Sequence, residues 1–93
     1  MSCINRYKFI KRMYPEYLVV FETNSGYKYE GIDKDIMVNF CSGKYQLSWL
    51  QKKHINYIVI DNLDIVSKYD DVKNNYFKYF YLASFCNILG KYR

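Results

Sequence analysis

The residue best suited to acid–base chemistry is His54, the only histidine in the chain. An imidazole can act as a general base near neutral pH, but it needs a nucleophile to deprotonate and a group that orients the ring. The sequence around His54 offers neither partner at a recognisable spacing. We therefore expect His54 to be a partly exposed residue at a helix end, and we assign no catalytic residue.

Metal and phosphate chemistry also lack their usual motifs. Asp61, Asp64, Asp70 and Asp71 could supply carboxylates to a divalent cation, but their spacing differs from that of an EF-hand loop. Gly43-Lys44 lacks the upstream glycine and the following Ser or Thr of a phosphate-binding loop. We expect the aspartates to be surface carboxylates or helix caps. The sequence thus predicts no metal site and no cofactor, and it favours a binding protein over an enzyme.

Cysteine usage indicates the compartment. Cys3, Cys41 and Cys86 are widely spaced and include no Cys-x-x-Cys pair. They make neither a disulfide framework nor a zinc ligand set, which predicts a reducing compartment. No apolar run has the length of a signal peptide or a membrane span. Together these features predict a cytoplasmic protein without membrane contact.

Charge is the feature that points to a partner. The 93 residues suit a single domain, residues 1–93, and carry 14 Lys and Arg against 9 Asp and Glu, a net charge of +5. This balance favours an anionic partner such as nucleic acid. Aromatic residues reach 20%, with 12 Tyr. Tyr, Asn, Ile, Lys and Phe all have AT-rich codons. An AT-rich genome is therefore a simpler explanation of the high aromatic content than a selected surface for stacking on bases.

The first predicted element is an amphipathic, basic helix over about residues 2–14. Its apolar face carries residues at spacings of three and four, namely Ile4, Tyr7, Ile10 and Tyr14. Four cations lie mostly elsewhere on the helix, namely Arg6, Lys8, Lys11 and Arg12. Such a basic face is either simply solvated or contacts a phosphate backbone. Pro15 disfavours helical geometry at Tyr14 and should end the helix there.

A β-hairpin is predicted next. Residues 17–22 (YLVVFE) and 27–32 (YKYEGI) have the composition of strands. The residues between them, Thr23 to Gly26, favour a turn with its tip near Asn24 to Gly26, because Asn and Gly tolerate positive φ. The second strand of this hairpin therefore brings aromatic and basic side chains together.

Two helices are expected after the hairpin. Asp33 fits the N-cap position of a helix over about 34–41, whose buried residues are Ile36, Met37 and Phe40. A further helical pattern covers residues 46–54, with Leu47 and Leu50 on one side.

The C-terminal part is predicted to contain strand and then helix. Residues 55–61 (INYIVID) form a near-continuous apolar run, which is typical of a central strand covered on both faces. Ile65 and Val66 suit a further short strand. A long helix then opens at Asp70-Asp71 and runs to about Leu89, with Gly90 as its C-cap. The predicted class is α/β (α+β), a small mixed sheet with flanking helices in the order αββααβ(β)α.

Residues 9–38, FIKRMYPEYLVVFETNSGYKYEGIDKDIMV, resemble the N-terminal mismatch-recognition domain of MutS DNA-repair proteins. In that domain a helix and a proline step lead into an apolar strand, a Gly-x-Phe-Tyr-Glu motif and a helix that begins near Asp-Asp-Ala. The similar pieces here are Pro15-Glu16, the strand through Phe21, the motif from Gly26 to Glu30, and Lys34-Asp35-Ile36. LSWLQKKHINYIVID is similar to a later helix-to-strand step, so the resemblance covers roughly residues 5–61.

The resemblance implies that the hairpin contacts DNA. The Phe of the family motif wedges against a mispaired base, and the Glu two positions later hydrogen-bonds to that base. Matched residue by residue, Glu30 stands at the Glu, Tyr29 at the Tyr and Lys28 at the Phe. A lysine cannot stack into a base step as an apolar ring does, so mismatch recognition by this mechanism is not expected. A shift of one residue would instead offer Tyr27 as the wedge.

Two functional interpretations follow. In the first, the chain is a small non-enzymatic domain that binds DNA or RNA through the four cations of the opening helix and through Tyr27, Lys28, Tyr29 and Glu30 of the hairpin. In the second, it is a protein-binding regulator or inhibitor, for example from a mobile genetic element, that acts on a host nucleic-acid machine. The C-terminal helix has more aromatic residues than one buried face uses, which favours packing against a partner or a second copy in a homodimer.

Overall fold

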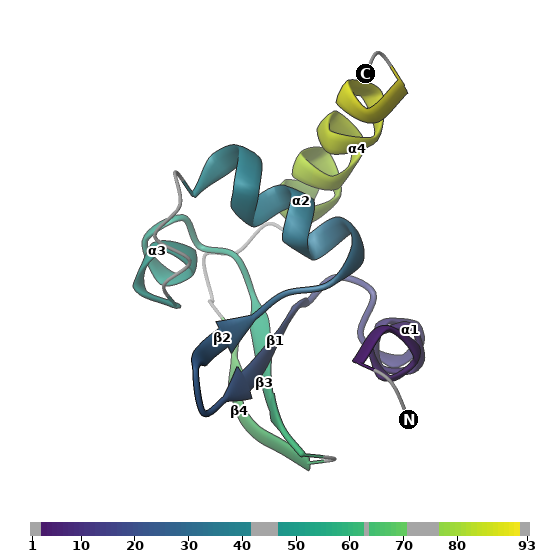
Figure 1. The fold of residues 1–93 in the computed structure, drawn as a ribbon. Coiled ribbons are helices and arrows are strands. Elements are labelled where there is room, and N and C mark those ends of the chain that lie inside the picture. Colours follow the sequence, from purple (N-terminus) through teal and green to yellow (C-terminus); the bar gives the residue numbers. More distant parts are fainter. Residues whose placement is uncertain (1–2, 42–46, 63, 71–76, 92–93) are drawn as a thin grey trace.

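A computed structural model of the chain describes the backbone of residues 3–41, 47–62, 64–70 and 77–91, and the side chains of these residues except 3–4, 77–78 and 88–91. Gly43-Lys44 and Asp71 therefore lie outside the described residues, as do the side chains of Cys3 and Ile4. The elements in chain order are α1 (Cys3–Met13), β1 (Leu18–Thr23), β2 (Gly26–Lys28), α2 (Gly31–Phe40), α3 (Leu47–Lys52), β3 (Tyr57–Asp61), β4 (Asp64–Tyr69) and α4 (Phe77–Lys91) (Figure 1).

The four strands form one mixed sheet in the order β2-β1-β3-β4. The two central strands, β1 and β3, are parallel neighbours, with Leu18 opposite Tyr57 and Phe21 opposite Ile60. The edge strands β2 and β4 pair antiparallel to them. The prediction of a small mixed sheet with flanking helices is confirmed. β1 and β3 are almost continuously apolar because both of their faces are buried, as is typical of central strands.

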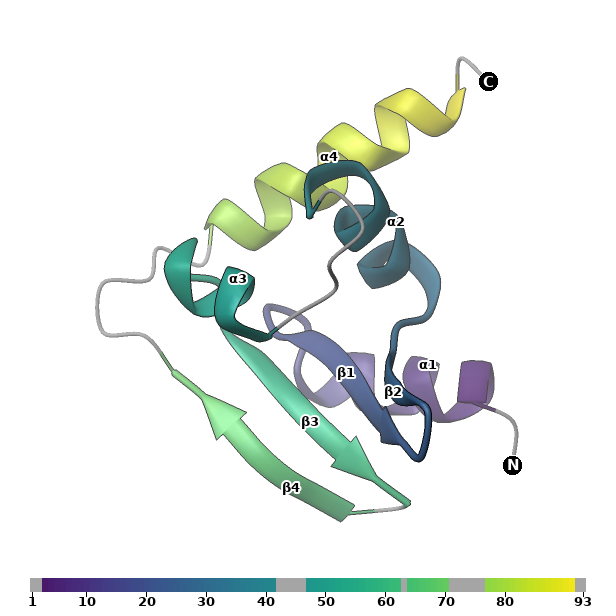
Figure 2. The same ribbon diagram turned by 60° about the vertical axis from the view of Figure 1, so that its left-hand side comes forward.

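Helices cover both faces of the sheet (Figure 2). On one face, α2, α3 and α4 pack on a core cluster that includes Leu18, Val20, Tyr57 and Val59. On the other face, α1 contributes Tyr7 and Ile10 to a second cluster, which also contains Val19, Phe21, Ile58 and Ile60. Successive residues of a strand point to opposite faces, so each central strand feeds both clusters. β4 lies at the uncovered edge of the sheet, and its residues are mostly exposed.

The predicted hairpin is confirmed, with Asn24 and Ser25 between its strands, but its second strand is Gly26–Lys28 and not 27–32, because the chain enters α2 at Gly31. Thr23 stands opposite Gly26 at the end of the β1–β2 ladder. The Thr23 hydroxyl donates to the Gly26 carbonyl oxygen at 2.7 Å and accepts from the Ser25 N–H at 3.2 Å, which closes the turn. Gly26 has φ +115°, a conformation that side-chain-bearing residues rarely adopt.

Several element boundaries differ from the predicted ones. α1 ends at Met13, before Tyr14-Pro15, as the proline predicted. α2 begins at Gly31 rather than near residue 34, and Glu30 occupies the N-cap position without a side-chain capping bond. The prediction that Asp33 caps this helix is therefore wrong. Asp33 lies in the first turn with its side chain buried, where it bonds to groups outside α2.

The C-terminal elements also depart from the expected pattern. β4 spans Asp64–Tyr69, longer than the expected Ile65-Val66, and its ladder with β3 shifts register between Val59 and Ile60. α4 is described from Phe77, and it continues through Gly90 to Lys91, so Gly90 is not its C-cap. The expected start of this helix at Asp70-Asp71 reaches outside the described residues, and Asp70 itself follows β4 and accepts a hydrogen bond from the Tyr17 hydroxyl.

Cys41 and Cys86 are buried, and no disulfide joins these two described cysteines. Within the described part of the chain, no helix combines the length and apolarity needed to cross a bilayer.

Gly31 provides a test of how α1 is seated against α2. Its φ is +57°, and an added Cβ would lie 2.6 Å from Cε2 of Tyr7 on α1. Gly31→Ala should therefore lower the free energy of unfolding through both left-handed strain and the clash with the ring. Gly26→Ala is the matched control, because Gly26 also has positive φ but no atom within 4 Å of the added Cβ. In urea unfolding, we expect the Gly31 variant to be less stable than the control by about 1–3 kcal/mol. Equal losses would contradict this seating of Tyr7.

Candidate nucleic-acid interface

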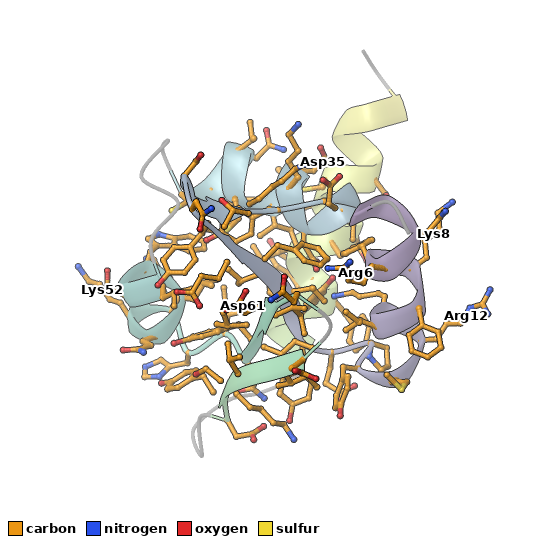
Figure 3. All side chains as sticks on the ribbon, turned by 60° about the horizontal axis from the view of Figure 1, so that its bottom comes forward. Arg6, Lys8, Arg12, Asp35, Lys52 and Asp61 are labelled. Atoms are coloured by element: carbon orange, nitrogen blue, oxygen red, sulfur yellow. The ribbon has the colours of Figure 1, made fainter. Side chains whose placement is uncertain are left out.

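The four cations of α1 fall into two pairs with different surroundings (Figure 3). Lys8 and Arg12, one helical turn apart, are exposed and point away from the sheet. Arg6 points back over the sheet and donates to the backbone oxygen of Asn62. Lys11 points into the protein. Only Lys8 and Arg12 therefore form the outward basic surface that the sequence suggested for all four.

The ammonium group of Lys11 is committed to the protein interior. Its Nζ lies 3.1 Å from both carboxylate oxygens of Asp33 and also donates to the carbonyl oxygen of Tyr17. It sits 3.9 Å from the ring centroid of Tyr79, a cation–π contact. Burial lowers the pKa of Lys11 to about 8, although the Asp33 carboxylate acts in the opposite direction. The expectation that Lys11 contacts phosphate is corrected on this geometry, because the protein already uses its donors.

Asp33 is the one buried charged residue among the described side chains, with 0% exposure. Besides Lys11, its carboxylate accepts from the Val19 N–H at 2.9 Å and from the Tyr79 hydroxyl. The pairing of β1 with β2 stops at Phe21 and Lys28. Because β2 is too short to pair with the Val19 N–H, the Asp33 carboxylate accepts from this N–H instead. Burial raises the pKa of Asp33, whereas the Lys11 ammonium and the hydrogen bonds from Tyr79 and Val19 lower it.

The Asp33–Lys11 pair generates a stability prediction. Asp33→Asn leaves the Lys11 ammonium buried without its counter-charge, and we expect a loss of about 3–5 kcal/mol in the free energy of unfolding, measured in urea. The double variant Lys11→Met, Asp33→Asn removes both charges and should lose less than the sum of the two single variants. Additive losses would show that the two groups do not depend on each other.

The hairpin residues predicted to contact nucleic acid also separate. Tyr29 is 6% exposed and belongs to the core cluster under α2, so the prediction that it stacks on a ligand is corrected. Tyr27, two residues earlier, is 43% exposed. Lys28 is exposed, and its Nζ lies 3.3 Å from Oε1 of Glu30. Tyr27 and Lys28 are therefore exposed, Glu30 is only 19% exposed and paired with Lys28, and Tyr29 is buried.

A groove runs between β2 and α2, and we call it the β2–α2 groove. Its volume is about 240 Å³, and it is lined by Tyr27, Lys28, Tyr29, Lys34 and Val38. Neither Lys34 nor Val38 was predicted to be a binding residue. They are four residues apart on α2 and out of phase with buried Ile36 and Met37, so helical spacing could have placed them on the outer face once the helix start was known.

The chemistry of the groove is aromatic and cationic. Tyr27 offers a partly exposed ring and Val38 an apolar wall, and the exposed lysines Lys28 and Lys34 complete the lining, with Lys28 paired to Glu30. Aromatic rings stack on nucleobases and ammonium groups pair with phosphates, so these side chains suit one strand of nucleic acid. His54 is exposed beyond the end of α3 and lies outside the groove lining, in keeping with its expected place at a helix end.

The fold and groove define a small mixed α/β domain with an aromatic, basic surface at one sheet edge. No protein-family model, curated protein or solved structure matches the chain.

The buried tyrosines of this region generate a prediction about the free energy of unfolding at alkaline pH. Burial raises the pKa of Tyr7, Tyr29 and Tyr79 above the usual value of 10.0, and the Asp33 carboxylate adds to the rise at Tyr7 and Tyr79. Below pH 10 both the folded and the unfolded chain keep these protons. Above it the unfolded chain loses protons that the folded chain retains, so the free energy of unfolding should fall as pH rises.

Near-ultraviolet absorbance of tyrosinate, recorded with circular dichroism, measures this behaviour. We expect part of the tyrosinate signal to appear only as the fold is lost. Tyr79→Phe, which removes one of the buried hydroxyls, should make the decline with pH shallower. Complete titration of all tyrosines while the fold persists would contradict the burial of these three rings.

Proposed function

We propose that the protein binds single-stranded nucleic acid through the β2–α2 groove. The observation that carries the proposal is a groove whose lining combines an exposed aromatic ring, Tyr27, with two exposed lysines, Lys28 and Lys34. Stacking on Tyr27 holds a base without regard to its identity, and the two lysines hold the flanking phosphates. The net charge of +5 attracts the polyanion from a distance.

The size of the groove favours a single strand over a duplex. A volume of about 240 Å³ between a strand and a helix accommodates a base with its sugar. Duplex DNA is read by an element that projects into one of its grooves, and Tyr27 instead lines a recess. The proposal takes from the MutS resemblance only the use of this hairpin for nucleic-acid contact. Lys28 stands where that family has its wedge residue, so a mismatched duplex should bind no better than a matched one.

Fluorescence anisotropy with labelled single-stranded DNA, matched duplex, mismatched duplex and RNA tests the proposal. Tyr27→Ala should weaken single-strand binding about tenfold or more, because a stacked base contributes roughly 1–3 kcal/mol, whereas Tyr27→Phe should retain most of the affinity. The double variant Lys28→Ala, Lys34→Ala should make log Kd less dependent on log salt by about 1.4, the value for two phosphate contacts with a single strand.

The matched control is Lys52→Ala, Lys53→Ala, which removes two exposed cations of the α3 region and leaves the groove unchanged. This control variant should bind single strands with nearly the affinity of the unchanged protein, because stacking on Tyr27 is intact. At most, the loss of two positive charges should weaken the long-range attraction of the polyanion. If the groove variants bind as tightly as the control, the groove is not the binding site. Clear preference for a mismatched duplex would contradict the role assigned to Lys28.

A protein partner is the second candidate function, and α4 carries the observation in its favour. Phe80, Tyr81 and Phe85 are partly exposed on this helix, and exposed aromatic residues are enriched in protein interfaces. A regulator or inhibitor that acts through this helix would bind its target with weak salt dependence. Absence of binding to every nucleic acid in the anisotropy experiment would favour this candidate.

A further inference from the structure

A recess lies where α2, α3 and α4 come together on one face of the sheet (Figure 2), and we call it the Trp49 recess. It has a volume of about 240 Å³ and is lined by Phe40, Trp49, Lys53, Ile55 and Leu82. Ile55 and Leu82 are buried members of the core cluster, and Phe40 and Trp49 pack against that cluster while only partly buried. The recess shares none of these residues with the β2–α2 groove, so the two surfaces are separate.

The walls of the Trp49 recess favour hydrocarbon over a nucleobase. The side chains of Phe40, Ile55 and Leu82 have no polar atom, and Lys53 is the one charged residue of the described lining. A base inserted here would leave polar groups of its edges without hydrogen-bond partners, which is costly. An aliphatic or aromatic side chain has no such groups to satisfy.

The size of the recess indicates a single side chain rather than a whole small molecule. Pockets for small molecules typically have volumes of roughly 300–1,000 Å³ and enclose most of the ligand. The Trp49 recess, at about 240 Å³, is smaller. Protein interfaces, by contrast, commonly place one large apolar side chain of the partner in a pocket of this kind.

The apolar surface continues from the recess onto α4. The ring centroid of Phe85 lies 5.7 Å from that of Phe40 in the recess lining. Phe85 follows Leu82 by three residues, so the two lie on the same side of α4, and Phe85 remains 41% exposed. A partner whose side chain fills the recess would therefore also cover Phe85.

The charge around the recess indicates an acidic partner. The lining comes from three segments, residues 36–41, 47–56 and 77–91, and none of them contains Asp or Glu. Lys53 lines the recess, Lys52 precedes it in the chain, and both are exposed. Carboxylates on the partner would therefore meet positive charge, with no like charge in these segments to repel them.

We propose that the Trp49 recess and the adjoining surface of α4 form a docking site for a protein partner whose binding segment carries a leucine or phenylalanine flanked by carboxylates. The apolar side chain fills the recess, and the carboxylates pair with Lys52 and Lys53. This site goes beyond the proposed nucleic-acid function and does not depend on it. It gives the second candidate function a location and a chemistry.

A library of random peptides displayed on phage and selected against the full chain, without nucleic acid present, tests the chemistry of the partner. We expect the enriched peptides to contain a leucine or phenylalanine with Asp or Glu on either side. Enrichment of basic peptides, or of no peptide, would overturn the proposal and leave the groove proposal standing.

An enriched peptide without tryptophan is then titrated while the emission of Trp49, the only tryptophan of the chain, is recorded. The apolar side chain should displace water from the indole and shift its emission to shorter wavelength. Replacing that side chain by alanine in the peptide should weaken binding about tenfold or more, and this comparison needs no variant of the protein. Binding that leaves the Trp49 emission unchanged would contradict the placement of the side chain.

Variants of exposed residues test the surface around the recess. Lys53→Glu should weaken peptide binding about fivefold or more, whereas Lys8→Glu, the same charge change on α1 across the sheet, should have little effect. Phe85→Ala should also weaken binding, and Phe9→Ala, which removes an exposed phenylalanine of α1, should not. Equal effects of these variants and their controls would overturn the site.

Analytical ultracentrifugation of the chain alone addresses the other occupant of this surface, a second copy. We expect no self-association that depends on Phe85. A dimer that Phe85→Ala dissociates would assign the surface to a second copy and overturn the proposal of an acidic partner.

Discussion

The buried carboxylate of Asp33 is the interaction on which the arrangement of the helices depends. It lies in α2 and accepts bonds from Lys11 of α1, from the backbone of β1 at Val19, and from the Tyr79 hydroxyl of α4. α1 and α4 cover opposite faces of the sheet, so this one group ties both layers to the central strand. An unpaired buried charge is costly, and the four elements are therefore held where its partners can reach it.

The same network shapes the candidate interface. Asp33 sits two residues after Gly31, where the chain leaves the hairpin and enters α2, and directly before Lys34 of the groove. Tyr7 packs against Gly31 on one side, which fixes the direction in which α2 departs. The groove wall thus depends on the buried pair behind it. Lys11 pairs with the buried Asp33 carboxylate, whereas Lys34 lines the surface groove. The two lysines differ in role because Lys11 lies on the inward side of α1 and Lys34 on the outward side of α2.

Much of the fold could be predicted from residue patterns. The apolar run of β3 indicated a central strand, the composition of residues 17–22 indicated the first strand of a hairpin, Asn24 to Gly26 indicated the turn, and Pro15 indicated the end of α1. Asp33 was misassigned because an aspartate before an apolar helix is also what a cap looks like. Its spacing to Ile36, Met37 and Phe40 places it in phase with the buried face of α2. Lys11 likewise follows Tyr7 by four residues and Ile10 by one, and two opposite charges in phase with apolar faces are a signal for a buried pair.

The sequence by itself determined the period of each element, the place of the hairpin turn and the excess of positive charge, because these depend on neighbouring residues and on composition. Only the tertiary structure decided which cations remain at the surface, that Tyr29 is in the core while Tyr27 is exposed, and that Lys34 meets the hairpin. Those outcomes depend on contacts between residues far apart in the chain, and burial depends on what another element places over a side chain.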